Sequence, residues 1–69
     1  MEPMDIKHAL EKAGCTQAEI ARRRKVSPAM VNRVIWRGDK ARHIHEEIAS
    51  VIGIPKEQIW PAYYGVQVR

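Results

Sequence analysis

The stretch TQAEIARRRKVSPAMVNRVIW, residues 16–36, begins with the sequence signal of a helix N-terminus. Thr16 and Glu19 have the spacing of a capping box, in which the threonine side chain accepts a hydrogen bond from the Glu19 amide and the glutamate bonds back to the Thr16 amide. The helix that follows is expected to cover residues 17–24 and to bury Ile20. It is short, because the sequence Val-Ser-Pro interrupts it soon afterwards.

A second helix is predicted directly after this interruption. Ser27 is a good N-cap, and Pro28 suits the first helical position, where its missing N–H costs nothing. The apolar residues that follow have helical spacing and predict a helix over residues 28–36. Two short helices joined by about three residues have the spacing of a helix-turn-helix.

A helical wheel divides the residues of the second helix between two faces. Val31, Val34 and Ile35 cluster on one side, which must face the core. The opposite side carries Ala29, Asn32, Arg33, Trp36 and Arg37. Arginine can pair with O6 and N7 of guanine, asparagine with N6 and N7 of adenine, and alanine can touch a thymine methyl group. The outer face therefore suits the major groove of double-stranded DNA.

A first helix is predicted upstream of this pair, over residues 5–13. Asp5 is the expected N-cap, and Gly14 stands where the end of a helix favours a positive φ. One face of this helix is apolar at the spacing i, i+3, i+4 and i+7. Its members are Ile6, Ala9, Leu10 and Ala13.

Further helices are predicted downstream, over residues 41–52 and 55–59, with Pro61 ending the last one. The expected fold is therefore all-α, a compact bundle of four to five short helices. With only 69 residues, the chain is expected to form a single domain over residues 1–69. Residues 65–69 are expected to form a flexible tail.

The composition indicates the kind of partner and compartment. Lys and Arg number 12 against 8 acidic residues, which gives a formal net charge of +4 and favours a polyanionic partner. A single cysteine, Cys15, agrees with a reducing compartment and is expected to be buried at a helix–helix contact. No apolar run is long enough for a membrane span and no signal-peptide pattern is present, so a cytoplasmic protein is expected.

The run from Gln17 to Ile35 resembles the helix-turn-helix of the lambda-repressor-like DNA-binding domains. Gln17 opens the motif, Ala21 occupies the small-residue position where the two helices touch, and Val26 begins the turn. The three apolar residues on the core side of the second helix match the buried positions of the motif. Two positions depart from it: Lys25 stands where glycine is usual, which requires a positive φ, and Arg24 stands where an apolar residue is usual.

The sequence IASVIGIPKEQIWPAYY, residues 48–64, resembles the end of the phage Ner regulators, with Ile59, Trp60, Pro61 and Tyr64 as the matching element. The two resemblances together imply a small transcriptional regulator of phage or prophage type, of repressor character, acting at the bacterial nucleoid. They imply base contacts by Ala29 and Arg33, with Asn32 beside them.

Phosphate contacts are expected from a second group of residues. The resemblance places Gln17 and Ser27 at backbone-contacting positions. Thr16 joins them because a helix N-terminus attracts anions. Charge alone adds Arg37, Lys40 and Arg42.

Several residues have a structural interpretation beside the functional one. The basic run 22–25 is either a DNA contact or the solvated end of a helix, where cations are favourable without a ligand. Trp36 either packs on the rim of the core against the helix over 41–52, the interpretation we favour, or touches the DNA backbone. Trp60 and Tyr64 are expected to seal one end of the core.

Enzymatic and metal-dependent functions find little support. His43 and His45 are two positions apart and do not share a helix face, so a metal site is not expected. No catalytic motif, cofactor site or small-molecule pocket is predicted. The sequence therefore predicts a regulator that binds double-stranded DNA as two copies on repeated half-sites. Their pairing as a homodimer is weak, forms only on DNA, or uses the tail over residues 62–69. A protein-interaction module that uses the same helix face is the alternative, whereas RNA-binding modules use an aromatic platform or glycine loop that is missing here.

Overall fold

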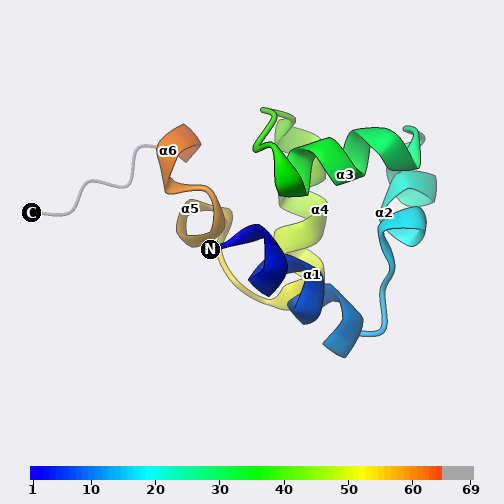
Figure 1. Cartoon of the computed structure of the whole chain (residues 1–69), viewed down its shortest axis with the longest axis horizontal. Coiled ribbons are helices and arrows are strands. Elements are labelled where there is room, and N and C mark those ends of the chain that lie inside the picture. The colour runs from blue at the N-terminus through cyan, green and yellow to red at the C-terminus, as the bar shows by residue number, and fades with distance from the viewer. Residues whose placement is uncertain (65–69) are drawn as a thin grey trace, which may run out of the picture.

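The computed structural model describes residues 1–64, and within them the chain forms six helices and no strand (Figure 1). These are α1 (Pro3–Lys12), α2 (Gln17–Arg24), α3 (Pro28–Trp36), α4 (Arg42–Ile52), α5 (Lys56–Ile59) and α6 (Pro61–Tyr64). The predicted all-α fold is confirmed, with one helix more than the four to five expected. The predicted tail, residues 65–69, lies outside the described residues.

The termini of α2 and α3 lie where the capping signals predict them. The Thr16 hydroxyl accepts from the Glu19 amide at 3.1 Å, and the Ser27 hydroxyl accepts from the Met30 amide at 3.2 Å. Only half of the capping box forms, because the Glu19 carboxylate accepts from Arg22 at 3.1 Å and not from the Thr16 amide. A charged guanidinium one turn along the helix is a stronger donor than a neutral amide.

The prediction for α1 is wrong at its N-terminus. The helix begins at Pro3 with Glu2 as its N-cap, and Asp5 lies inside the first turn. Proline at the first helical position already has a helical φ, and an acidic residue in the first turn interacts favourably with the helix dipole, so both residues favour the earlier start. The other end is as predicted, since Gly14 follows the helix with a φ of 74°.

The interpretation of Pro61 as a stop signal alone is also wrong. Pro61 follows the end of α5 and begins α6, because its ring both prevents one helix from continuing and favours the first position of the next. The result is a pair of single-turn helices beside the N-terminus of α1, on the side of the molecule away from α2 (Figure 1).

The core lies where α1, α2, α3 and α4 meet, and α5 closes it at one end. Its fully buried side chains come from every one of these helices: Ile6, Leu10, Ile20, Val31, Val34, Ile35, Ile44, Ile48 and Ile59. Cys15 is buried at the start of the link to α2, as predicted, and Ala21 is buried where α2 contacts α3. Trp60 is 6% exposed and Tyr64 packs partly on the core, which confirms that these residues seal its end.

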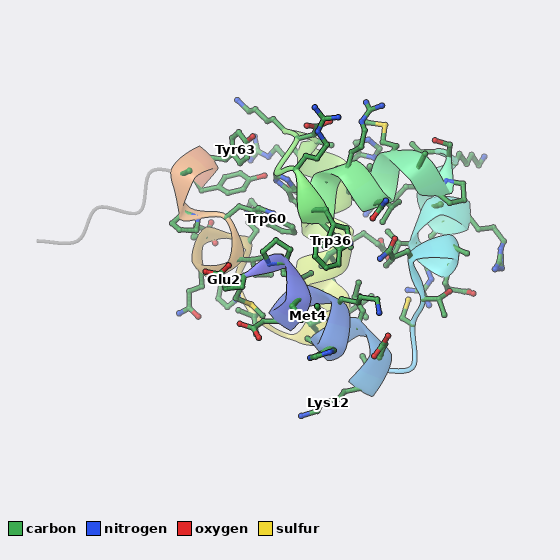
Figure 2. The ribbon with its side chains drawn as sticks, viewed as in Figure 1. Glu2, Met4, Lys12, Trp36, Trp60 and Tyr63 are labelled. Carbon is green, nitrogen blue, oxygen red and sulfur yellow. The ribbon has the colours of Figure 1, made fainter. Side chains whose placement is uncertain are left out.

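Trp36 does not join the core, contrary to the interpretation favoured from the sequence. Its side chain is 42% exposed and lies on the side of α3 that faces α1 (Figure 2). The residue occupies the last turn of α3 on the helix face opposite Val34, so burying it would require α3 to rotate and expose its valines. The geometry of the helix therefore decides its position.

Lys25 has the positive φ that the turn requires, 58°, although it is not a glycine. A side chain in this left-handed conformation costs roughly 1–2 kcal/mol. We therefore expect Lys25→Gly to raise the free energy of unfolding by about 0.5–1 kcal/mol, because glycine removes this cost but loses more chain entropy on folding. Urea unfolding measures the change. Lys25→Ala is the control: it keeps a Cβ and should not stabilise, and equal stabilisation by both variants would contradict the strain argument.

Candidate nucleic-acid interface

The outer face of α3 is open to solvent as the helical wheel predicts. Ala29, Asn32, Arg33 and Arg37 are all exposed, whereas Val31, Val34 and Ile35 are buried. The helix is therefore held by its apolar side and presents its polar side outward. The half-buried Met30, beside Ala29 near the start of α3, borders this face and was not expected there.

Positive charge is concentrated in the segment that surrounds α3. Eight of the 12 Lys and Arg residues lie between residues 22 and 42, and this segment contains one acidic residue, Asp39. The first 12 residues, in contrast, contain three acidic residues and two lysines. Positive charge distributed in this way attracts a polyanion to α3 and the turns on either side of it.

The basic run 22–25 is mainly structural. Arg23 and Arg24 each bind the Glu47 carboxylate of α4, at 3.0 Å, and Glu47 is only 16% exposed. Hydrogen bonding to Glu47 raises the pKa of Arg23. The stem of Arg24 is half-buried, as its apolar position in the motif implies. These contacts join the C-terminal turn of α2 to α4, and within residues 1–64 only Lys25 of this run makes no ion pair.

Arg33 is already engaged by the one acidic residue of this segment. Its Nε donates to Oδ2 of Asp39 at 3.0 Å, and both side chains stay accessible, at 54% and 40% exposure. Asp39 lies in the turn between α3 and α4, which Gly38 initiates with a φ of 73°. The candidate base-reading arginine is thus paired with a carboxylate on the turn that follows its own helix.

A tyrosine of α6 and a buried histidine of α4 hold the backbone of this turn. The Tyr63 hydroxyl donates to the carbonyl of Gly38, and Nε2 of His45 lies 3.2 Å from the carbonyl oxygen of Asp39. Tyr63 comes from α6, which the sequence analysis did not predict. The turn that carries Asp39 is therefore bonded to the C-terminal part of the described chain as well as to α4.

His45 is fully buried, and its neighbours define its protonation state. A carbonyl oxygen can only accept, so Nε2 carries the proton toward Asp39, and Nδ1 accepts from the Tyr64 hydroxyl at 2.7 Å. The ring stacks on Trp60, with centroids 3.9 Å apart and planes inclined by 15°. Burial lowers the pKa of His45 and raises the pKa of Tyr64, so the neutral forms of both persist at pH 7.

The candidate phosphate-contacting residues surround α3 in three groups. Thr16 and Gln17 lie at the start of α2, Ser27 lies at the start of α3, and the remaining group follows α3. This last group comprises Arg37, Lys40 and Arg42, all exposed. The hydroxyls of Thr16 and Ser27 accept from helix amides, which leaves their protons available for an anion.

Ion pairing distinguishes the basic members of these groups. Arg42 pairs with Glu46 one turn along α4, at 3.3 Å. Within the described part of the chain, Arg37 and Lys40 have no ion-pair partner. Together with Lys25 in the turn before α3, they carry the uncompensated positive charges close to α3 within residues 1–64.

The sequence analysis missed three residues of this region: Asp39, His45 and Tyr63. A signal existed for His45, since it precedes Ile48 and Ile52 at the spacing i, i+3 and i+7 and so falls on the buried face of α4. No local pattern marks Asp39 or Tyr63, because their partners lie across a turn or 25 residues away.

A comparison with protein-family models assigns the chain to a family. The model described as winged helix-turn-helix DNA-binding matches residues 1–68, and the chain belongs to this family. Comparisons with curated proteins and with solved structures gave no match. The chain is therefore a helix-turn-helix DNA-binding protein, and the helix-turn-helix predicted from the spacing of α2 and α3 is confirmed.

Three features are absent from the described residues. Residues 1–64 contain no strand, so the β-hairpin to which the word winged refers is not among them. Within the same residues, no group of three or more acidic, histidine or cysteine side chains is placed to hold a metal ion. No helix of the described chain has both the length and the apolar composition that crossing a bilayer requires.

Proposed function

We propose that the protein is a sequence-specific regulator of transcription that inserts α3 into the major groove of double-stranded DNA. The observation that carries this proposal is the composition of the solvent-facing side of α3, where small and hydrogen-bonding side chains stand between the cations that follow the helix and those of α2. A surface for docking another protein would be more apolar at its centre. Regulation follows from occupancy of a promoter, without chemistry.

Three residues of α3 are assigned to base reading: Ala29, Asn32 and Arg33. They lie at the spacing i, i+3 and i+4, so they share one helix face, and all three are exposed. In the major groove Arg33 would select guanine, Asn32 adenine, and Ala29 a thymine methyl group. Each good bidentate pair contributes about 1–3 kcal/mol of discrimination.

Binding strength is assigned to the surrounding donors, Thr16, Gln17, Ser27, Arg37, Lys40 and Arg42. If about four to six phosphates are neutralised, the logarithm of the affinity falls against the logarithm of salt concentration with a slope of roughly −4 to −5 per monomer. One small module reads few base pairs, so we further propose that two copies occupy half-sites about one helical turn apart and pair weakly or only on DNA.

The biological setting is proposed from sequence resemblance. The similarity to lambda-repressor-like domains and to the end of the Ner regulators favours a phage or prophage regulator that acts on DNA in the bacterial cytoplasm. Within the element that carries the second similarity, Ile59 and Trp60 are buried at the end of the core. Tyr64 bonds His45, which in turn bonds the turn after α3. That position gives the resemblance a physical reason within this fold.

The experiment selects a duplex from a randomised library with the wild-type protein and compares it with a fixed unrelated duplex by fluorescence anisotropy over a salt series. We expect Arg33→Ala to weaken binding to the selected duplex by about 1–3 kcal/mol, with little effect on the unrelated duplex or on the salt slope. Lys40→Ala should weaken binding to both duplexes and reduce the salt slope by about 1.

Lys12→Ala is the matched control, because it removes one positive charge at the far end of α1, away from α3 (Figure 2). It should change binding much less than Lys40→Ala does. Equal effects of the two lysine variants would show that binding responds to net charge and not to this face. Binding without any preference between duplexes would refute the assignment of base reading to α3, and no salt-dependent binding to either duplex would favour a protein partner.

A further inference from the structure

The ion pair between Arg33 and Asp39 leaves the arginine able to read a base. Only Nε of Arg33 donates to the carboxylate, and within residues 1–64 its two Nη groups have no hydrogen-bond partner. Those Nη groups form the end of the guanidinium fork, which can meet two acceptors such as O6 and N7 of guanine. A carboxylate on Nε therefore fixes the plane of the guanidinium without occupying its reading edge.

Asp39 itself is held in place by contacts that lead into the core. Its carbonyl accepts from the buried His45, and its amide donates to the carbonyl of Arg33 at 3.4 Å. The preceding carbonyl, that of Gly38, accepts from Tyr63. The carboxylate is consequently attached to a turn that is bonded to α3, α4 and α6, whereas an arginine alone on an exposed helix face would lose several rotatable bonds of freedom on binding.

The negative charge of Asp39 opposes DNA binding, so its presence beside the proposed reading face calls for a compensating role. It is the single acidic residue in a segment with eight cations, and its side chain is accessible beside the proposed reading face. A carboxylate placed there repels phosphates and lowers affinity for any duplex. A gain in discrimination would offset that loss of affinity.

We infer that Asp39 is a positioning residue that orients the Arg33 guanidinium for guanine, so that it increases sequence discrimination while it decreases affinity for DNA in general. This inference rests on the proposed function of α3. Most interface residues change sequence discrimination and general affinity for DNA together. Removing Asp39 should instead lower the discrimination and raise the general affinity.

The test uses the full chain and the duplex selected by the wild-type protein. The Arg33→Ala variant identifies the guanine at which the base preference is lost, and this guanine is then replaced by 7-deazaguanine. This base lacks the N7 acceptor, so it reports on that single contact. We expect Asp39→Ala to bind an unrelated duplex more tightly than wild type, because a repulsive charge is removed. Its loss of affinity for the 7-deazaguanine duplex should be about three- to tenfold smaller than the loss measured for wild type.

Glu46→Ala is the matched control, because Glu46 pairs with Arg42 in the same manner but on α4. It removes the same charge and should raise affinity for an unrelated duplex similarly. Its loss of affinity for the 7-deazaguanine duplex should equal that of wild type. Asp39→Asn keeps an acceptor for Nε of Arg33 and should retain part of the affinity loss that wild type shows for the 7-deazaguanine duplex. Thermal unfolding of each variant without DNA identifies any loss of fold, and the isosteric asparagine variant keeps the test decisive if the alanine variant is destabilised.

The outcomes distinguish this inference from the proposed function. If the Asp39→Ala variant keeps the full penalty for 7-deazaguanine, or discriminates better than wild type, Asp39 does not position the arginine and the inference is overturned. If no guanine preference depends on Arg33 in the first place, the proposed reading role of α3 fails instead.

Discussion

Truncation of Trp60 to alanine is expected to lower the free energy of unfolding by about 3–5 kcal/mol, the range for removing a large buried aromatic side chain. The indole is 6% exposed and lies flat against the fully buried His45 ring. A domain of this length has a total stability of only about 3–10 kcal/mol at the usual value per residue. The variant should therefore be substantially unfolded at 37 °C, which circular dichroism and urea titration measure.

The second tryptophan provides a control of identical chemistry. Trp36 is 42% exposed and lies outside the core cluster, so Trp36→Ala should change stability by less than about 1 kcal/mol. A loss as large as that of Trp60→Ala would mean that Trp36 contributes buried contacts that its exposure does not indicate. Trp60→Phe keeps an aromatic ring against His45 and should recover part of the lost stability.

The parts of the fold that the sequence predicted well are those fixed by local signals. The bounds of α2 and α3 match the predicted ranges. Thr16 and Ser27 accept from amides three residues along the chain, and Pro28 favours the first helical position through its fixed φ. The buried and exposed faces of α3 follow from the helical period alone. The positive φ of Lys25 was likewise implied by its place in the turn.

The parts that escaped prediction depend on contacts between distant residues. Arg33 and Asp39 pair only because Gly38 turns the chain back, and Tyr63 reaches Gly38 from 25 residues away. The hydrophobicity of Trp36 suggested burial, but its position on the helix face prevented it. Even for His45, periodicity could indicate burial but not which acceptor its Nε2 proton would face.

The base-reading and phosphate-contacting assignments have a different status. These side chains are exposed except for the half-buried Gln17, and the family match establishes DNA binding for the chain as a whole. Which base each residue contacts depends on the docked position of α3, and that position is set by the DNA as much as by the protein. The assignments of Ala29, Asn32 and Arg33 therefore stay predictions until the selection experiment is done.

Acidification is expected to destabilise the domain through His45. Burial lowers its pKa, so the folded protein resists protonation that the unfolded chain accepts at its ordinary pKa of about 6.5. The unfolded state then binds more protons, and the free energy of unfolding decreases as the pH falls. The contribution of neutral His45 is complete above pH 6.5 and is lost progressively as the pH falls toward the lowered pKa of the folded state.

The size of this effect has an upper bound. One proton taken up on unfolding changes the free energy of unfolding by at most about 1.4 kcal/mol per pH unit. Urea unfolding at intervals between pH 7.5 and 5 measures the slope. The carboxylate of Glu57, whose pKa is lowered by a hydrogen bond from its own backbone amide, affects the slope mainly below this range.

Two variants separate His45 from the other histidines. His45→Gln cannot titrate but retains a donor for the Asp39 carbonyl, so it should be less stable than wild type at pH 7.5 and show a smaller slope down to pH 5. His43→Gln makes the same substitution at an exposed histidine two residues away and is the matched control. If the slope persists in the His45→Gln variant, another group titrates. In wild type, a proton added to this ring would occupy Nδ1 and disrupt the hydrogen bond from Tyr64, while Nε2 would still donate to the Asp39 carbonyl.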